Sequence, residues 1–348
     1  MRVLVTGGAG FIGSHTCLSL IKKGYQIVVL DSYANSHKES LKRVNKILNL
    51  KNSEKIKLFK ADIRNEEMLE KLFADSKKEN NPILAVMHFA GLKSVSESIQ
   101  NPMIYWDVNF NGSLKLFKIM DKFDCRTVVF SSSATIYSLS SSTNLKEDSN
   151  IGPNNPYGET KLAVEKLLQK MFAKQKNLWR IANLRYFNPI GAHKSGLIGE
   201  SPLGLPNNIF PLITQVALGM IDKFFIFGND WPTLDGTGVR DYIHVMDLAE
   251  GHISALEYLL KNEPQILNIN LGTGKGTSVM ELINIFQDIN KIKIPYEIKG
   301  RRVGDLPSVI ADNSLAIKCL KWFPKRTIQE MCADGWKWQK LNPNGFKN

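Results

Sequence analysis

The sequence has few cysteines and no long apolar segment. Four cysteines among 348 residues, none in a Cys-x-x-Cys pair, argue against a disulfide framework and a zinc site. The longest stretch without a charged residue, 201–221, contains Asn207, Asn208 and Gln215, whose polar groups would be unsatisfied in a bilayer. The N-terminus also lacks the apolar segment of a signal peptide. We therefore expect reduced thiols, no metal, no membrane association and a cytoplasmic location.

Acidic residues are also scarce relative to basic ones. There are 45 Lys and Arg against 33 Asp and Glu, a net charge of +12, which indicates an anionic partner such as nucleic acid or a nucleotide. Much of the excess lies in 38–60, where Leu41, Val44 and Leu48 recur at helical spacing. No helix-turn-helix or interleaved aromatic pattern accompanies these lysines, so we expect an amphipathic surface helix there and no nucleic-acid partner.

Short β-branched runs alternate with helical segments through the first half of the chain. This alternation predicts an α/β fold, a doubly wound parallel sheet of the Rossmann type, with a smaller C-terminal α/β unit. Loops rich in Gly, Pro and Asn follow Pro189, so we predict domains at 1–189 and 190–348. Strands are expected at 2–6, 27–31, 56–60, 84–89, 127–131 and 179–184, and the last of these is expected to close the sheet.

Glycines at fixed spacing follow the first expected strand. Gly7, Gly10 and Gly13 form Gly-x-x-Gly-x-x-Gly, a turn that lets the backbone approach a pyrophosphate at the N-terminus of a helix. Alone the motif is weak evidence for a dinucleotide site, because glycines at this spacing also occur in strand-to-helix turns that bind no ligand. Asp31 strengthens it, since a carboxylate at the end of the next strand accepts hydrogen bonds from ribose hydroxyls. With no arginine between Asp31 and Lys42, NAD is favoured over NADP.

Other candidate contacts follow the third and fourth strands. Asp62 and Ile63 stand where a carboxylate and an apolar side chain could bracket the adenine, although a helix cap or turn is the plain alternative for Asp62. Lys93 could reach a cofactor ribose or a substrate phosphate. We interpret His88, in the fourth strand, as structural.

A tyrosine and a lysine one helical turn apart supply the candidate reactive group. Tyr157 and Lys161 are spaced i, i+4 after Pro156, which places them on one helix face. A nearby cation favours phenolate, so we expect the pKa of Tyr157 to fall, aided by the positive nicotinamide ring. The phenol could then act as a general acid/base. An exposed helical pair is the alternative, but the Ser-rich strand end at 131–135 and the dinucleotide motif favour the catalytic interpretation.

These motifs coincide with those of a known group. The sequence resembles the short-chain dehydrogenase/reductase superfamily and, within its extended branch, is similar to the UDP-glucose 4-epimerases over essentially the whole chain. The resemblance rests on segments 5–16, 88–93, 130–137, 184–191, 206–208, 226–230, 236–247 and 301–307.

The resemblance implies an isomerase with a permanently bound NAD. Such an enzyme interconverts UDP-galactose and UDP-glucose at C4 through a transient 4-keto sugar. Tyr157 would take the proton of the 4-hydroxyl, Ser133 would hydrogen-bond the same oxygen, and Lys161 would hold the cofactor ribose. The resemblance further implies that 1–189 binds NAD, that 190–348 binds the UDP-hexose, and that helices near 104–122 and 161–174 form a homodimer.

The remaining site residues are assigned by the same resemblance. The implied cofactor-binding residues are Gly7, Gly10, Phe11, Ile12, Gly13, Asp31, Asn35, Asp62, Ile63, Phe89, Ala90, Gly91, Lys93, Asn109, Tyr157, Lys161 and Phe187. The implied substrate-binding residues are Lys93, Ser133, Tyr157, Tyr186, Asn188, Asn208, Ile209, Phe225, Phe227, Arg240, Arg302, Asp305 and Val309.

One departure from the group bears on the substrate. Val309 stands where many bacterial members carry a tyrosine, so the hypothesis is that UDP-N-acetylhexosamines are also accepted. A second departure, Ser138 in place of a glycine, concerns the Ser-rich surface loop expected at 138–142.

Two alternatives remain at this point. A nucleotide-sugar 4,6-dehydratase shares NAD and the 4-keto sugar, but such enzymes carry a Thr-Asp-Glu segment where this chain has Ser133-Ala134-Thr135. A non-catalytic NAD- or nucleotide-binding protein would not need both Tyr157 and Lys161. The glycine-rich segment 272–278 lacks phosphate-loop spacing and is expected to be a turn with a Ser/Thr helix cap.

Overall fold

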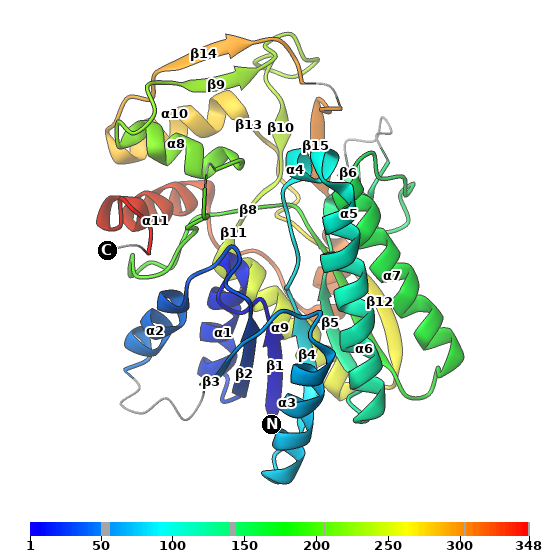
Figure 1. The fold of residues 1–348 in the computed structure, drawn as a ribbon. Coiled ribbons are helices and arrows are strands. Elements are labelled where there is room, and N and C mark those ends of the chain that lie inside the picture. The colour runs from blue at the N-terminus through cyan, green and yellow to red at the C-terminus, as the bar shows by residue number, and fades with distance from the viewer. Residues whose placement is uncertain (50–55, 139–143, 205, 303, 347–348) are drawn as a thin grey trace.

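A seven-stranded parallel sheet forms the centre of the molecule (Figure 1). The computed structural model describes residues 1–49, 56–138, 144–204, 206–302 and 304–346. The strand order is β12-β7-β5-β4-β1-β2-β3. The strands are β1 (Arg2–Thr6), β2 (Gln26–Asp31), β3 (Ile56–Lys60), β4 (Ile83–His88), β5 (Thr127–Ser131), β7 (Arg180–Tyr186) and β12 (Gln265–Leu271).

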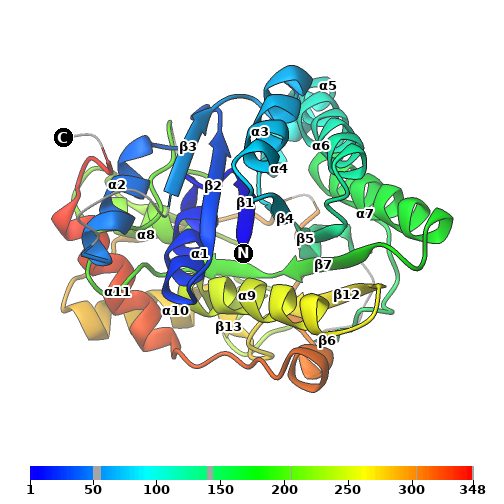
Figure 2. The same cartoon turned by 90° about the horizontal axis from the view of Figure 1, so that it is seen from below.

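Helices cover both faces of this sheet, as Figure 2 shows from below. In β1, Val3 and Val5 pack into one core while Leu4 packs into the other, because successive side chains of a strand point to opposite faces. The first core is covered by α1 (Phe11–Lys22), α2 (Lys38–Ile47) and α9 (Val245–Lys261). The second is covered by α3 (Glu66–Lys78), α6 (Gly112–Lys122) and α7 (Pro156–Lys174).

A smaller part with its own core lies beyond the carboxyl edge of the sheet (Figure 1). Its short strands form a four-stranded sheet and two pairs: β13 (Thr277–Ser278), β10 (Val239–Arg240), β15 (Ser308–Ala311) and β6 (Asn144–Leu145); β8 (Asn188–Ile190) with β11 (Tyr242–His244); and β9 (Phe224–Phe227) with β14 (Tyr296–Lys299). Its helices are α8 (Ile209–Ala217), α10 (Val279–Asn290) and α11 (Ile328–Leu341).

Between β4 and α6 the chain forms α4 (Val95–Gln100), α5 (Pro102–Tyr105) and a π-helix, η2 (Trp106–Asn111). Short helices also occur at η3 (Ala134–Ile136) and η4 (Ala316–Leu320). In the described part of the chain, no helix is long and apolar enough to cross a membrane.

The predicted fold class and strands are confirmed, with one correction at the sheet edge. The strand predicted to close the sheet, β7, lies inside it, and β12 forms the edge. Strand β12 and helix α9 come from 190–348 but belong to the central sheet and its covering layer. Local periodicity does not show which strand a distant segment joins. The division at residue 189 stays a prediction.

Two predicted local features are confirmed and two fall partly outside the described residues. Helix α2 buries Leu41 and Val44 as its spacing predicts. Ser278 caps α10, with Glu281 completing a capping box, as expected for a turn and not a phosphate loop. Positions 50–55 of the basic segment 38–60, and 139–142 of the expected Ser-rich loop, lie outside the described residues.

Candidate active site

The turn between β1 and α1 is built for close approach to a ligand. Gly7 has φ +69°, and a Cβ there would lie 2.7 Å from the backbone nitrogen of Ala90. A Cβ on Gly13 would lie 2.3 Å from the carbonyl oxygen of Gly7. Gly10 caps α1 without a side-chain hydrogen bond, so no side chain covers the amides of Phe11 and Ile12 from that position. These features fit the pyrophosphate of a dinucleotide.

Asp31 is fixed at the carboxyl end of β2. Its carboxylate accepts hydrogen bonds from the Ala9 amide at 2.9 Å, the Tyr33 amide at 2.9 Å and the Ser36 hydroxyl at 2.7 Å. The side chain is therefore oriented before any ribose binds. In the loop that follows, the Asn35 side-chain oxygen accepts a hydrogen bond from the Leu203 amide at 2.9 Å, which links this loop to the smaller part of the molecule.

Asp62 and Ile63 lie in different environments. Asp62 pairs with Arg64 at 2.8 Å, and this hydrogen-bonded guanidinium lowers the pKa of the Asp62 carboxyl. Arg64 also pairs with Asp107 at 2.6 Å, a link that the sequence reasoning missed. Ile63 is buried and packs against Gly112 at the start of α6. The side chains of Asp62 and Arg64 are both partly exposed.

Asn109 holds the loop that follows β4. Its amide group donates hydrogen bonds to the Leu92 carbonyl at 3.1 Å and to the Thr160 hydroxyl at 3.0 Å, and accepts one from the Leu92 amide at 2.7 Å. Both amide hydrogens are thus used within the protein. This residue lies in the π-helix η2, an irregularity frequent at functional sites. Asn109 was predicted to bind cofactor, and in this structure it positions the loop of Phe89, Ala90 and Gly91.

The predicted reactive residues meet at the carboxyl edge of β5. Tyr157 lies in the first turn of α7, where Asn155 caps the helix by accepting from the Gly158 amide. Ser133, Tyr157 and Lys161 are 6%, 6% and 5% exposed. The Lys161 ammonium donates to the Ser131 carbonyl at 2.9 Å and lies 5.8 Å from the centre of the Tyr157 ring.

Two hydroxyls complete this group. The Ser133 oxygen accepts hydrogen bonds from the amide and the hydroxyl of Thr135, at 3.2 and 3.0 Å. The Ser131 hydroxyl donates to the phenol oxygen of Tyr186 at 2.9 Å, so Tyr186 also faces this region. Phe187 is buried next to it, in a cluster that includes Val309.

Burial sets the protonation of these groups. It raises the pKa of the Tyr157 phenol, Tyr186 adds to the rise, and a hydrogen bond with Ser133 opposes it. Burial lowers the pKa of Lys161 to about 8. The predicted fall in the pKa of Tyr157 is therefore wrong for the protein alone, because loss of hydration outweighs a lysine whose ammonium is directed at a carbonyl. A net fall of the pKa below its ordinary value therefore requires positive charge from outside the chain.

A buried ion pair behind the reactive group was not found from the sequence. Arg185 on β7 pairs with Glu165 on α7 at 2.8 Å, and both are buried. The Ser132 hydroxyl donates to the same carboxylate, so the pair fixes α7 to the strand end next to Ser133. Glu165 could have been noticed in the sequence because it lies eight residues after Tyr157. No local pattern, however, indicates that Arg185 is its partner.

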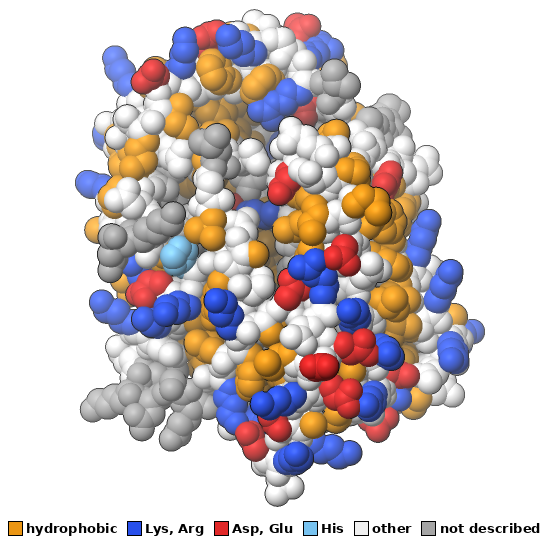
Figure 3. Space-filling model, viewed as in Figure 1, with side chains coloured by type: hydrophobic (Ala, Val, Ile, Leu, Met, Phe, Trp, Pro, Cys, Tyr) orange, Lys and Arg blue, Asp and Glu red, His pale blue; other side chains and the backbone are white. Residues whose placement is uncertain are grey.

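Figure 3 shows that the molecule is hollowed between the part with β9 and β14 and the sheet edge. The predicted substrate residues form two groups of contacts. In the first group, Lys93 and Asn208 both bond to the carboxylate of Glu200, at 2.8 and 2.9 Å. Glu200 was also missed by the sequence reasoning. Ile209 follows as the first residue of α8.

The second group is basic and aromatic. Arg240 donates to the Leu306 carbonyl at 2.9 Å and lies 3.8 Å from the Asp305 carboxylate. The Arg302 guanidinium stacks 3.7 Å from the centre of the Phe227 ring. Asn188, in β8, is tied by its backbone amide to the Asp241 carbonyl at 3.0 Å. Phe225 points away from the buried residues of β9, and its ring contacts the Lys299 ammonium.

A Rossmann-type sheet with a glycine turn and a buried Tyr-Lys pair at its carboxyl edge defines the class of short-chain dehydrogenases/reductases. The family model described as GDP-mannose 4,6 dehydratase matches residues 4–335. The chain belongs to this family and, at 47% identity over its whole length, to the UDP-glucose 4-epimerases.

The relatives agree in length and in fold. A UDP-glucose 4-epimerase of Bacillus subtilis is 47% identical, with 100% of this chain and 99% of the relative covered. A UDP-glucose-4-epimerase of Stenotrophomonas maltophila, solved with NAD and formylated UDP-arabinopyranose, superposes with a TM-score of 0.93 at 43% identity, covering 99% of each chain. One from Bifidobacterium longum, solved with NAD+ and UDP, gives 0.92 at 43% identity, covering 99% of this chain and 100% of the other.

Proposed function

We propose that the protein is an isomerase that interconverts UDP-galactose and UDP-glucose at C4 with NAD. The observation that carries this proposal is the buried group of Ser133, Tyr157 and Lys161 beside the glycine turn, in a chain that matches UDP-glucose 4-epimerases end to end. The turn at Gly7 and Gly13 would hold the NAD pyrophosphate, and Asp31 would accept the ribose hydroxyls. When bound, NAD supplies a reversible acceptor for the two electrons that leave C4 of the sugar.

The chain's own residues move the proton. Tyr157 takes the proton of the sugar 4-hydroxyl in one direction and returns it in the other. The Ser133 oxygen already accepts two hydrogen bonds from Thr135, so its hydroxyl acts as a donor. It donates a hydrogen bond to the same sugar oxygen. The Lys161 ammonium supplies positive charge near the phenol and favours its ionised form. No carboxylate follows Ser133, so the acid/base pair that a dehydratase needs is absent from this strand end.

Epimerisation also requires a firm hold on the nucleotide and a loose hold on the hexose, because the 4-keto sugar must present its other face. We assign the firm hold to Asn208, Arg240 and Arg302 with Asp305, which supply amide and guanidinium donors suited to a diphosphate and a uridine. Their stacking and carbonyl contacts fix these side chains in the protein alone.

A homodimer and a cytoplasmic location belong to the same proposal. Apolar side chains gather over α5 and α6 in Figure 3. The exposed apolar side chains of these helices and of the neighbouring α4 are Ile99, Met103, Ile104 and Leu114, and Met103 is 79% exposed. An exposed apolar face of this kind favours association with a second copy. The boundary at residue 189, between the NAD part and the UDP-hexose part, is likewise kept as a proposal.

Val309 leads to a prediction about substrate range. Its side chain lies in β15 against the cluster of Phe187 and Tyr137, where a tyrosine would occupy more of the space next to the site. We expect the natural chain to epimerise UDP-N-acetylglucosamine and Val309→Tyr to lose at least about 90% of that activity while keeping UDP-galactose turnover, as about 1–3 kcal/mol of steric discrimination allows. A variant equally active on both substrates would contradict the prediction.

The proposed function is tested most directly by proton NMR of the anomeric signals. Purified protein is incubated with UDP-galactose and no added NAD, and UDP-glucose is expected to appear until the ratio is constant. This result requires both epimerisation and NAD retained through purification. A spectrum that stays unchanged even after NAD is added would overturn the proposal.

A further inference from the structure

A large cavity lies away from the site described above. Its volume is about 1010 Å³, and it opens between the C-terminal end of α1, the first half of α9, and α11 with the segment preceding it. The proposed NAD site uses the opposite, N-terminal end of α1. Six basic and three acidic side chains line the cavity. Neither the proposed reaction nor its site residues account for this positive charge.

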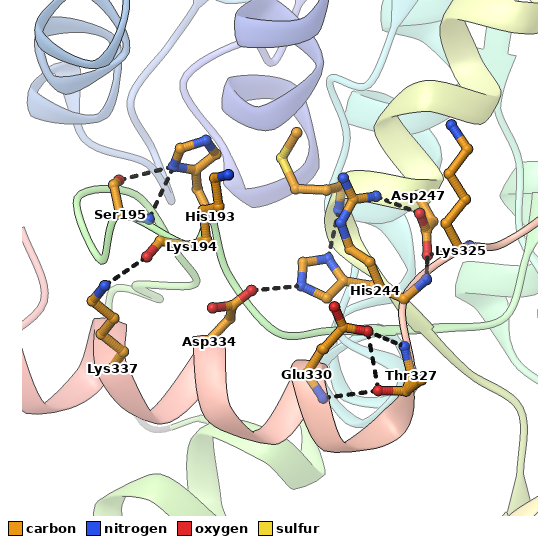
Figure 4. Close-up of polar contacts among 12 residues, drawn as sticks. His193, Lys194, Ser195, His244, Asp247, Lys325, Thr327, Glu330, Asp334 and Lys337 are labelled. Atoms are coloured by element: carbon orange, nitrogen blue, oxygen red, sulfur yellow. Dashed lines mark hydrogen bonds and ion pairs between the residues drawn. The ribbon is translucent and has the colours of Figure 1, made fainter.

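Part of that charge is neutralised by fixed ion pairs, and Figure 4 shows the contacts of Asp247 and the pair of Asp334 with His244. Arg326 pairs with Asp247 and with Glu250, and Lys325 pairs with Glu250 at 3.0 Å. The Asp334 carboxylate lies 3.4 Å from the buried ring of His244. These contacts tie α9 to the segment before α11, and α11 to His244 at the start of α9. They engage Glu250 and Asp334, and the third acidic group of the wall, Glu330, accepts a hydrogen bond from the Thr327 amide.

Three lysines on the wall have no such partner. Within the described ranges, no carboxylate lies at ion-pair distance from Lys22, Lys194 or Lys321. They come from three separate segments and converge on one cavity. Lys321 has φ +52°, a left-handed conformation unusual for lysine, so its position is maintained at a cost in backbone energy.

His193 lies in the cavity wall together with these lysines. Its Nδ1 atom is hydrogen-bonded to Ser195 at 2.8 Å, and the ring is buried against the cavity wall. Burial lowers the pKa of His193 to about 4, Lys22, Lys194 and Arg326 add to the fall, and Asp334 opposes it. The imidazole is therefore neutral at pH 7 and does not add to the charge of Lys22 and Lys194, the two nearby cations without an ion-pair partner among the described residues.

From this arrangement we propose that the cavity binds a small molecule carrying two or more phosphate groups. Phosphate oxygens would pair with Lys22, Lys194 and Lys321, while apolar side chains such as Met246, Trp322 and Phe323 would contact the rest of the ligand. The lysines line a hollow and not a flat or convex face, which favours a small molecule over a nucleic acid. The volume matches the pockets that hold ligands of nucleotide size.

The test uses the protein saturated with NAD and UDP, so that the proposed active site is occupied, and inorganic tripolyphosphate as the probe. Isothermal titration calorimetry in 50 mM salt is expected to show one tripolyphosphate site per chain that does not displace UDP. The variant Lys22→Gln/Lys194→Gln/Lys321→Gln should bind the probe at least about tenfold more weakly. Each lysine–phosphate ion pair at an exposed site contributes part of the binding free energy, and the variant loses three of them. Its epimerase activity should be unchanged.

A matched variant separates a site from a general charge effect. Lys71→Gln/Lys78→Gln/Lys293→Gln removes the same charge from exposed lysines that do not line the cavity, and it should bind tripolyphosphate like the natural chain. Equal weakening in both variants, or no binding to the natural chain, would overturn the proposal. Lys194→Glu, which reverses one exposed charge, provides a second variant should the triple substitution not fold, and affinity equal to that of the natural chain would again overturn it.

Discussion

At the scale of single residues, Tyr157 depends on its surroundings for its chemistry. The phenol is buried, and burial raises its pKa by more than its hydrogen bond with Ser133 lowers it. Removing the hydroxyl leaves the ring and its packing in place but deletes the proton acceptor. We therefore expect Tyr157→Phe to retain bound NAD and to lose turnover by about 10²–10⁴-fold, measured by UDP-galactose conversion. Tyr258→Phe, on α9, is the control, and near-normal turnover of Tyr157→Phe would refute the assigned role.

Lys161 gives a prediction about pH. Its ammonium favours the phenolate, so its loss in Lys161→Met should raise the pKa of Tyr157 further. The acid limb of the kcat/KM profile, which needs the ionised phenol, should then move to higher pH. Lys161→Arg keeps the positive charge and should leave the limb nearer its original position. Identical limbs in the natural chain and Lys161→Met would argue against the coupling.

Site residues could be predicted from the sequence when their role depends on neighbours along the chain. Tyr157 with Lys161, and the glycines at 7, 10 and 13, are of this kind. Glu200 and Glu165 could not be predicted, because their partners Lys93 and Arg185 are 107 and 20 residues away. The pKa of Tyr157 was predicted with the wrong sign because the sequence shows spacing but not the depth of burial.

At the scale of elements, the turn into α1 is the most constrained local structure of the proposed NAD site. A methyl group on Gly13 would collide with backbone atoms of Gly7 and Gly8. Backbone atoms cannot move aside as the end of a flexible side chain can. We expect Gly13→Ala to reduce the NAD retained per chain at least about tenfold, measured after purification, because the turn must open to admit the methyl group. Gly300→Ala meets no atom within 4 Å and serves as the control. Equal NAD content in both variants would contradict the prediction.

The elements themselves were predictable where periodicity is strong. The strands β1, β2, β3 and β5 lie where alternating or β-branched runs indicated them, and α2 buries the side chains that its spacing selects. Strand β12 was not predicted, because its sequence, QILNINL, places two asparagines within an apolar run. The structure satisfies them: Asn268 accepts from Asn183 on β7, and Asn270 bonds to Tyr137 and Leu145.

At the scale of the whole molecule, the exposed apolar face on α4 to α6 predicts the oligomeric state. A carboxylate introduced at its most exposed member, Met103→Glu, would have to be buried without a partner in a dimer. We expect this variant to run as a monomer in size-exclusion chromatography with light scattering, and the natural chain to run as a dimer. Leu234→Glu, on an exposed loop outside this face, should remain dimeric. A monomeric natural chain would contradict the proposal.

The position of β12 at the edge of the central sheet has a consequence for synthesis of the protein on the ribosome. When β7 has emerged, its outer edge has no partner until residues 187–271, which include β12 itself, are also translated. At about 5–20 residues per second, this strand stays open for about 4–17 seconds. An open strand edge is a template for pairing with another chain. The nascent protein is thus most exposed to aggregation late in translation, after most of its sheet has already formed.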